Sequence, residues 1–110
     1  MAAKMQEKLM TKNGVKMPTA AIEALCRKWR VSELALFGSV LRSDFRQDSD
    51  IDVLIVFASD ATWDLMDFVT MKDELESLLG RSVDLVEKKA IRNPLLRREI
   101  LSHNEVIYAA

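Results

Sequence analysis

Two aspartates one residue apart, Asp50 and Asp52, are the strongest chemical signal in this sequence. They begin an apolar run rich in β-branched residues, 51–57, which predicts a buried strand. Side chains at positions i and i+2 of a strand point to the same face, so the two carboxylates are expected to lie together. Like charges this close raise each other's pKa unless a cation lies between them, and Mg²⁺ prefers such oxygen ligands. The pair predicts a divalent-cation site, although a solvated strand end would show the same pattern.

A third aspartate, Asp84, lies between Val83 and Leu85 in a second short apolar run, 82–86, which also predicts a strand. If the two strands are neighbours, Asp84 lies beside the Asp50–Asp52 pair. Three carboxylates around one point can hold two metal ions for in-line displacement at phosphorus. Taken alone, Asp84 is equally compatible with a surface position on an edge strand.

The dipeptide Gly38-Ser39 directly follows the apolar run 33–38, which predicts the first strand. A glycine at such a turn allows the backbone to approach a phosphate closely, and the N–H groups that open the next helix can bind it. The Ser39 hydroxyl adds a donor, and the guanidinium of Arg42 adds a forked cation for phosphate oxygens. An ordinary turn followed by a surface arginine is the alternative for these residues.

The remaining hydrophobic pattern predicts the elements that must position these side chains. We expect helices over about 18–30, over 63–79 with Gly80 as its C-terminal cap, and from Asn93-Pro94 to about 102. Val106 to Tyr108 predicts a last, edge strand. The order indicates an α+β fold, a small mixed β-sheet with helices packed on one side, in which Leu95 and Leu96 would face the sheet.

The chain of 110 residues suits a single domain, which we place at 17–110. Residues 1–16 are expected to form an N-terminal extension, either a frayed helix or disordered, with Asn13-Gly14 marking a turn. The single cysteine, Cys26, belongs to the apolar stripe of the first helix, so packing is expected rather than reactivity. The lone histidine, His103, is expected at the surface or in a helix cap.

Charge and composition indicate the cellular location of the protein and the kinds of partner that it binds. The formal net charge is −1, yet residues 1–30 hold seven Lys or Arg and residues 43–76 hold ten Asp or Glu. The near-neutral total argues against stable binding to nucleic acid. One cysteine, no signal peptide and no apolar run long enough for a membrane span predict a cytoplasmic protein. A cationic run, 88–98, is expected to be solvated or to meet an acidic partner.

The linked motifs resemble the signature of the polymerase-β-like nucleotidyltransferase superfamily. The resemblance is carried by Gly38-Ser39-x-x-Arg42 and by the run from Ser49 to Val56, which contains Asp50 and Asp52. It spans about residues 18–108, and the short length is similar to the minimal nucleotidyltransferase (MNT) branch. Asp84 falls where that family places its third carboxylate.

The resemblance implies a reaction, cofactors and a partner. Asp50, Asp52 and Asp84 would bind Mg²⁺, two ions in the full site, and Asp84 would help deprotonate the acceptor. Gly38, Ser39 and Arg42 would hold the phosphates of ATP, and AMP would pass to a hydroxyl group as pyrophosphate leaves. Members of the branch act with a HEPN-class partner, often a toxin, and some are antitoxins that adenylylate its tyrosine. A hetero-oligomer is therefore expected.

Two alternatives to this enzyme remain open at the level of sequence. The first is a non-catalytic MNT-type module that neutralises its partner by contact; the second is transfer to a small molecule, for which no acceptor domain is visible. Many relatives have glycine directly after the arginine, where this chain has Ser43. If the backbone there requires positive φ, serine costs about 1 kcal/mol relative to glycine. The intact carboxylates favour the enzyme.

Overall fold

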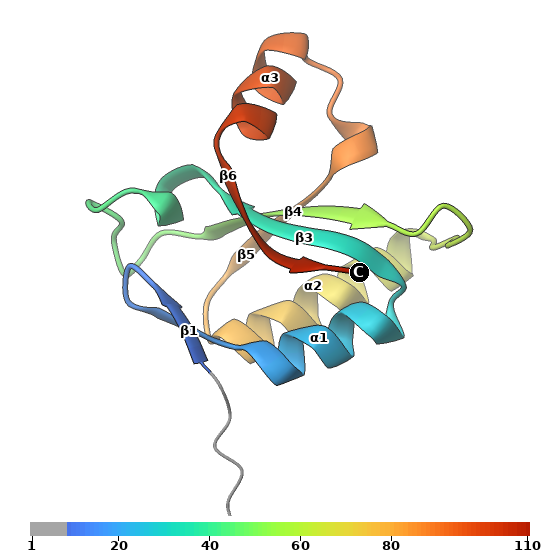
Figure 1. Ribbon diagram of the computed structural model, residues 1–110, viewed down its shortest axis with the longest axis horizontal. Helices are drawn as coiled ribbons and strands as arrows, with labels where there is room; N and C mark the ends of the chain where they lie inside the picture. Colours follow the sequence, from blue (N-terminus) through green and yellow to red (C-terminus); the bar gives the residue numbers. More distant parts are fainter. Residues whose placement is uncertain (1–8) are drawn as a thin grey trace, which may run out of the picture.

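The computed structural model describes residues 9–110 and contains two sheets and three α-helices (Figure 1). The main sheet has four strands in the order β5-β4-β3-β6, in which β4 and β5 are parallel and the other pairs antiparallel. The strands are β3 (Val31–Phe37), β4 (Ile51–Phe57), β5 (Val83–Glu87) and β6 (Asn104–Ala109). The α+β class with a mixed sheet is thus confirmed, and β6 is the expected edge strand.

Capping residues set both ends of α2 and the start of α3. In α2 (Leu65–Leu79), Asp64 and Asp67 form a reciprocal capping box, and Gly80 ends the helix in the left-handed conformation at φ 67°. In α3 (Pro94–Ser102), the Asn93 side chain accepts hydrogen bonds from the N–H groups of Leu95 and Leu96. None of the helices described between residues 9 and 110 is long and apolar enough to cross a bilayer.

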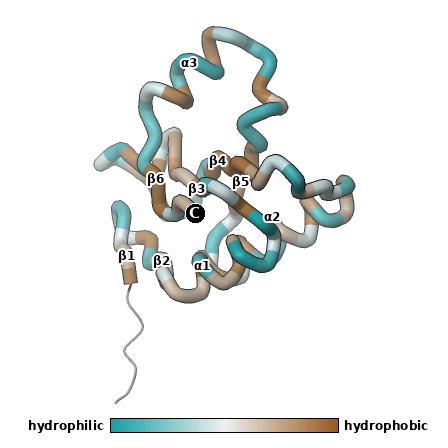
Figure 2. The backbone as a smooth tube through the Cα atoms, turned by 45° about the vertical axis from the view of Figure 1, so that its right-hand side comes forward, coloured by the Kyte–Doolittle hydropathy of each residue, from teal (hydrophilic) through white to brown (hydrophobic). Residues whose placement is uncertain are grey.

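The sheet has two covered faces rather than one. Helices α1 (Thr19–Lys28) and α2 lie on one face, while Ile100 of α3 packs against Ala35 and Leu54 on the other, so that α3 stands apart from the other helices in Figures 1 and 2. The expectation that all helices share one side therefore needs correction. Leu95 and Leu96 were expected to face the sheet, but their side chains are 76% and 52% exposed because α3 turns Ile100 inward instead.

Residues 9–18 form a β-hairpin, whereas a frayed helix or disorder was expected up to residue 16. Residues 1–8 lie outside the described part of the chain, but β1 (Leu9–Lys12) and β2 (Val15–Pro18) pair antiparallel across the expected Asn13-Gly14 turn. The hairpin is ordered because Val15 and Met17 are fully buried in the main core. The expected domain start at residue 17 therefore falls inside β2, a strand of this hairpin.

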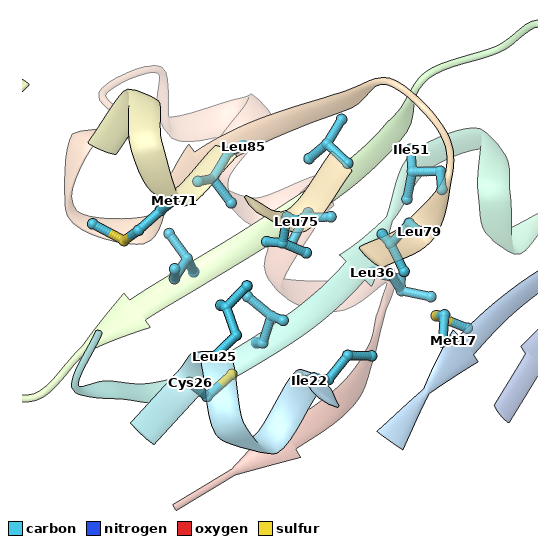
Figure 3. Close-up of a cluster of buried hydrophobic side chains, with 14 of the residues drawn as sticks. Met17, Ile22, Leu25, Cys26, Leu36, Ile51, Met71, Leu75, Leu79 and Leu85 are labelled. Carbon is cyan, nitrogen blue, oxygen red and sulfur yellow. The ribbon is translucent and has the colours of Figure 1, made fainter. Parts of the chain in front are cut away.

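The main core lies between the sheet and helices α1 and α2. Figure 3 shows Leu25 and Cys26 of α1 and Met71 and Leu75 of α2 pointing toward the apolar face of the sheet. Burying one such side chain stabilises the fold by roughly 1.5–3 kcal/mol. Cys26 is fully buried, and this burial raises the pKa of its thiol to about 12, so the expectation of packing rather than reactivity is confirmed.

The environment of Cys26 leads to a chemical prediction. Because the thiol is buried and protonated at neutral pH, we expect it to react with a thiol reagent such as DTNB only after denaturation. Stoichiometric labelling of the native protein at pH 8 within minutes would contradict the packing of α1.

Candidate active site

Residues from three neighbouring strands meet in a row at the edge of the main sheet where β3 ends and where β4 and β5 begin. Asp52 of β4 pairs in register with Asp84 of β5 on one side and with Phe37 of β3 on the other. These side chains alternate with Ile51, Val53 and Val83, which point into the main core, so the row lies on the α3 face of the sheet. The adjacency of the two aspartate strands, a condition of the sequence argument, is therefore met.

The pKa of Asp52 reflects its burial and the charges of the neighbouring carboxylates. Burial raises the pKa of the half-buried Asp52, and the charges of Asp84 and Asp50 raise it further. Asp50 lies one residue before β4 and is exposed, as is Asp84. Three carboxylates that repel one another at one edge of a sheet reduce stability, an arrangement typical of functional sites.

Gly38 is the residue that the geometry of this edge most strictly requires. Its φ is 74°, a left-handed conformation that side chains disfavour. A Cβ atom added at this position would collide with Oδ2 of Asp52. Glycine combines this backbone conformation with the close approach to the carboxylate, so the contact with Asp52 accounts for a glycine at position 38.

The turn that carries Ser39 and Arg42 is shorter than expected. It is a single 3₁₀ turn, η1 (Gly38–Leu41), closed by the Arg42 N–H donating to the Ser39 carbonyl at 2.9 Å. A long helix dipole is therefore not available here, and phosphate binding would depend on local N–H groups and side chains. The Arg42 guanidinium is exposed and lies 3.3 Å from Asp44, a surface pair weak enough to exchange for a phosphate.

Two positioning residues were not found from the sequence. Arg81 donates to the carbonyl oxygens of Arg46 and Ser49 at 2.9 and 2.8 Å, which fixes the loop leading to Asp50. Glu76 of α2 accepts from the Val83 N–H at 2.9 Å, which fixes the start of β5 beside Asp84. Both contacts join residues that are distant in sequence or depend on the fold, so no local pattern indicates them.

Ser43 stands where many relatives have glycine, but its backbone conformation does not require glycine. Between residues 9 and 110, Asn13 and Arg30 are the only non-glycine residues with positive φ. Ser43 therefore adopts an ordinary backbone conformation, and serine carries no left-handed penalty at this position.

A cleft of about 650 Å³ opens beside the turn, between α3 and the start of β6. Phe37 and Gly38 lie at its sheet side, Leu96 and Ile100 at its helix side, and Arg42 and His103 line it with polar groups. His103 is the exposed C-cap residue of α3, as expected for a surface or capping position. A cleft of this size is large enough for a nucleoside.

A second cleft, of about 580 Å³, lies at the other end of β4 beside Trp63 and Phe68, away from the aspartates.

The donor set at the row of aspartates fits a divalent cation that is completed by its substrate. Between residues 9 and 110, no group of three or more acidic, His or Cys side chains is placed to hold a metal ion, so the expected three-carboxylate site is not assembled by the protein alone. Mg²⁺ commonly takes one or two carboxylates and fills its other positions with water and substrate phosphates. Asp52 and its neighbours Asp50 and Asp84 provide hard oxygen ligands of this kind, and their mutual repulsion would be relieved by a cation.

Comparison with known proteins identifies the class to which this fold and site belong. Residues 19–107 match the nucleotidyltransferase domain family. The chain is 40% identical over 84 residues to MJ0128 of Methanocaldococcus jannaschii, a protein assigned by name as a protein adenylyltransferase, covering 76% of this chain and 82% of that protein. It is 33% identical over 90 residues to the protein adenylyltransferase MntA of Thermococcus cleftensis, covering 82% and 86%.

Solved structures show the same fold. A minimal nucleotidyltransferase superposes with a TM-score of 0.64 at 36% identity, covering 78% of this chain and 85% of that one. A toxin–antitoxin complex with AMP-PNP gives a TM-score of 0.68 at 23% identity, covering 86% and 75%. A Shewanella oneidensis complex of an MNT antitoxin with a tri-AMPylated HEPN toxin gives 0.59 at 22% identity, covering 84% and 70%.

The fold and the matched region define a nucleotidyltransferase. Within that class, the chain belongs to the minimal nucleotidyltransferase family. The resemblance inferred from Gly38-Ser39 and the aspartate pair is thereby confirmed at the level of family and enzyme class.

Neutralising Asp52 is expected to stabilise the protein. Asp52→Asn removes a half-buried charge that faces Asp84 and Asp50, so we expect a higher melting temperature at pH 7 without divalent cations. Mg²⁺ should raise the melting temperature of the wild type more than that of the variant. Asp48→Asn is the matched control, since Asp48 is exposed and outside the row. A lower melting temperature for Asp52→Asn in differential scanning fluorimetry would contradict the repulsion inferred here.

Gly38 and Gly80 form a matched pair for testing the turn. Both have positive φ, but a Cβ at Gly80 meets nothing within 4 Å, whereas a Cβ at Gly38 meets Asp52. Alanine should cost about 1 kcal/mol of strain at either position. Only Gly38→Ala should also abolish nucleotide transfer, because it displaces the Asp52 carboxylate. Equal activity of the two variants in a transfer assay would show that the close approach is not required.

Proposed function

We propose that this protein transfers AMP from ATP to a tyrosine hydroxyl of a HEPN-class partner, in a Mg²⁺-dependent reaction, and so acts as an antitoxin. The observation that carries the proposal is the row at the sheet edge, where Gly38 packs against Asp52 and Asp84 lies beside it. The family membership supports nucleotidyl transfer, and the relatives named as protein adenylyltransferases support a protein acceptor. The AMP-PNP and AMPylated-toxin complexes of related fold suggest ATP and the partner class.

The chemistry requires one bond to form and one to break at the α-phosphorus of ATP. The acceptor oxygen attacks this phosphorus, the bond to the bridging oxygen of the β-phosphate breaks, and pyrophosphate leaves. Asp84, at the open side of the row, would take the proton of the attacking hydroxyl. Ser39 and Arg42 would hold the departing phosphates at the other side. Asp50 and Asp52 would hold Mg²⁺, which when bound neutralises charge on the phosphates.

The order of the strands supports a proposed position for each reacting group. From β5 to β6 the edge presents Asp84, then Asp52, then Phe37 with the adjoining phosphate turn, and then the cleft. The acceptor would therefore approach from the β5 side, opposite the outer phosphates on the turn. Because the nucleoside is bonded to the α-phosphate, it would extend from beside Asp52 over Phe37 into the cleft next to α3, rather than lie beyond the outer phosphates. The apolar surfaces of Phe37 and Leu96 suit a base, and the cleft has room for it.

The outer surface of α3 has the composition of a protein interface, which supports an acceptor supplied by a partner protein. Leu95 and Leu96 are large, exposed apolar side chains, and Arg92 and Arg98 are exposed cations on the same segment. Exposed apolar side chains ringed by charge are typical of protein interfaces. Since Leu96 also lines the cleft, a partner bound here would lie next to the bound nucleotide.

The proposal is tested by incubating the protein with α-labelled ATP, Mg²⁺ and a candidate HEPN-class partner protein. We expect label on the partner, with a loss of at least a hundredfold in Asp50→Ala and Asp52→Ala, as is usual when a group that stabilises transition-state charge is removed. Asp48→Ala, an exposed aspartate in the same loop, should transfer normally.

The same variants separate catalysis from inhibition by contact. If Asp52→Ala neutralises the partner fully and the wild type deposits no label, the protein is a binding module and the enzymatic proposal is wrong. Replacing the acceptor tyrosine of the partner by phenylalanine should remove the label without weakening the complex, which tests the tyrosine assignment separately.

A further inference from the structure

The tip of the N-terminal hairpin reaches the phosphate turn. The Nδ2 atom of Asn13 donates to the Val40 carbonyl at 2.6 Å and to the Arg42 carbonyl at 2.8 Å, across sequence separations of 27 and 29 residues. In Figure 1 the hairpin lies beside the segment that follows β3. The Val40 carbonyl lies within η1 and the Arg42 carbonyl directly after it, so one side chain from outside the turn holds the backbone on both sides of Leu41.

The chemistry of the contact fits the amide of asparagine and not a carboxylate. Two carbonyl oxygens converge on one atom, and only an N–H₂ group can donate to both. Carbonyls at the end of a 3₁₀ turn lack partners within the turn, so Asn13 acts as its C-terminal cap. Without these bonds, the turn would be free to move Ser39 and Arg42 relative to Asp52.

The backbone at the hairpin tip restricts which residue can make this contact. Asn13 and Gly14 have φ of 48° and 88°, two successive positive values that a tight two-residue hairpin turn requires. Asparagine tolerates this conformation better than most residues and also brings the donor group. The Asn13-Gly14 pair thus forms the turn and binds η1 at the same time.

The hairpin is a fixed support because its strands are anchored elsewhere. Val15 and Met17 are buried in the main core, and the Lys12 ammonium lies 2.8 Å from the Glu105 carboxylate of β6. Asn13 is therefore tied to the sheet as well as to η1. It also lies before residue 19, where the match to the nucleotidyltransferase family begins.

We propose that Asn13 is a positioning residue for nucleotide binding. It holds the turn Gly38–Leu41 and Arg42 in the conformation that binds the outer phosphates of ATP. This inference rests on the proposed function, because it assigns the phosphates to that turn. Asn13 touches neither substrate nor metal; it acts through the carbonyls of Val40 and Arg42.

The test compares Asn13→Gly with Thr11→Gly in the full chain. Glycine keeps the positive φ at position 13 and removes only the amide, while Thr11→Gly places the same flexible residue at an exposed position of β1. We expect Asn13→Gly to weaken ATP binding and raise KM for ATP roughly tenfold, the effect of losing two hydrogen bonds. Binding of AMP, which lacks the outer phosphates, should be unchanged, and Thr11→Gly should bind both like the wild type.

Asn13→Asp is the second variant, because aspartate has nearly the same size and tolerates the same φ but cannot donate when ionised. It should lose ATP affinity at least as strongly as Asn13→Gly. Wild-type ATP affinity in either Asn13 variant, or an equal loss of ATP and AMP binding, would overturn the inference, since a general structural defect does not distinguish the two nucleotides. A wild-type protein that binds ATP without transferring AMP would instead contradict the proposed function and leave this comparison valid.

Discussion

The placement of Asp52 between Asp84 and Gly38 is the constraint on which the rest of the site depends. Burial and two like charges raise the pKa of Asp52, so the protein keeps an arrangement that reduces its own stability. Such strain persists only where the surrounding structure determines it and where it serves a function. The register of β4 with β5 fixes Asp52 beside Asp84, and a slip of either strand by one residue would turn the aspartate of that strand toward the main core.

The surroundings of this row hold its parts from several directions. Glu76 fixes the start of β5, Arg81 fixes the loop before Asp50, and Gly38 leaves room for the Asp52 carboxylate. Each support comes from a different element, and all converge on one edge of the sheet. A site assembled in this way places its ligands before substrate arrives, which reduces the entropic cost of binding.

The parts of the structure that the sequence predicted are those with local causes. The aspartate pair follows from the period of a strand, and the end of α2 and the start of α3 follow from Gly80 and Asn93. The hairpin was missed because strands of four residues give too short an alternation to separate Val15 and Met17 from a weak helical stripe. Three features could not be predicted: the side of the sheet on which α3 packs, the contacts of Arg81 and the contacts of Asn13. Each depends on segments that only the fold brings together, and a single sequence carries no local signal for such contacts.

A crystal structure with Mg²⁺ and the non-hydrolysable analogue AMP-PNP tests the central claim most directly. The account predicts a metal ion about 2.1 Å from carboxylate oxygens of Asp50 and Asp52, with the outer phosphates on the turn that begins at Gly38. The nucleoside should lie in the cleft beside Phe37. An ordered nucleotide in the cleft beside Trp63, or phosphates bound away from Gly38 with no metal at the aspartates, would contradict it.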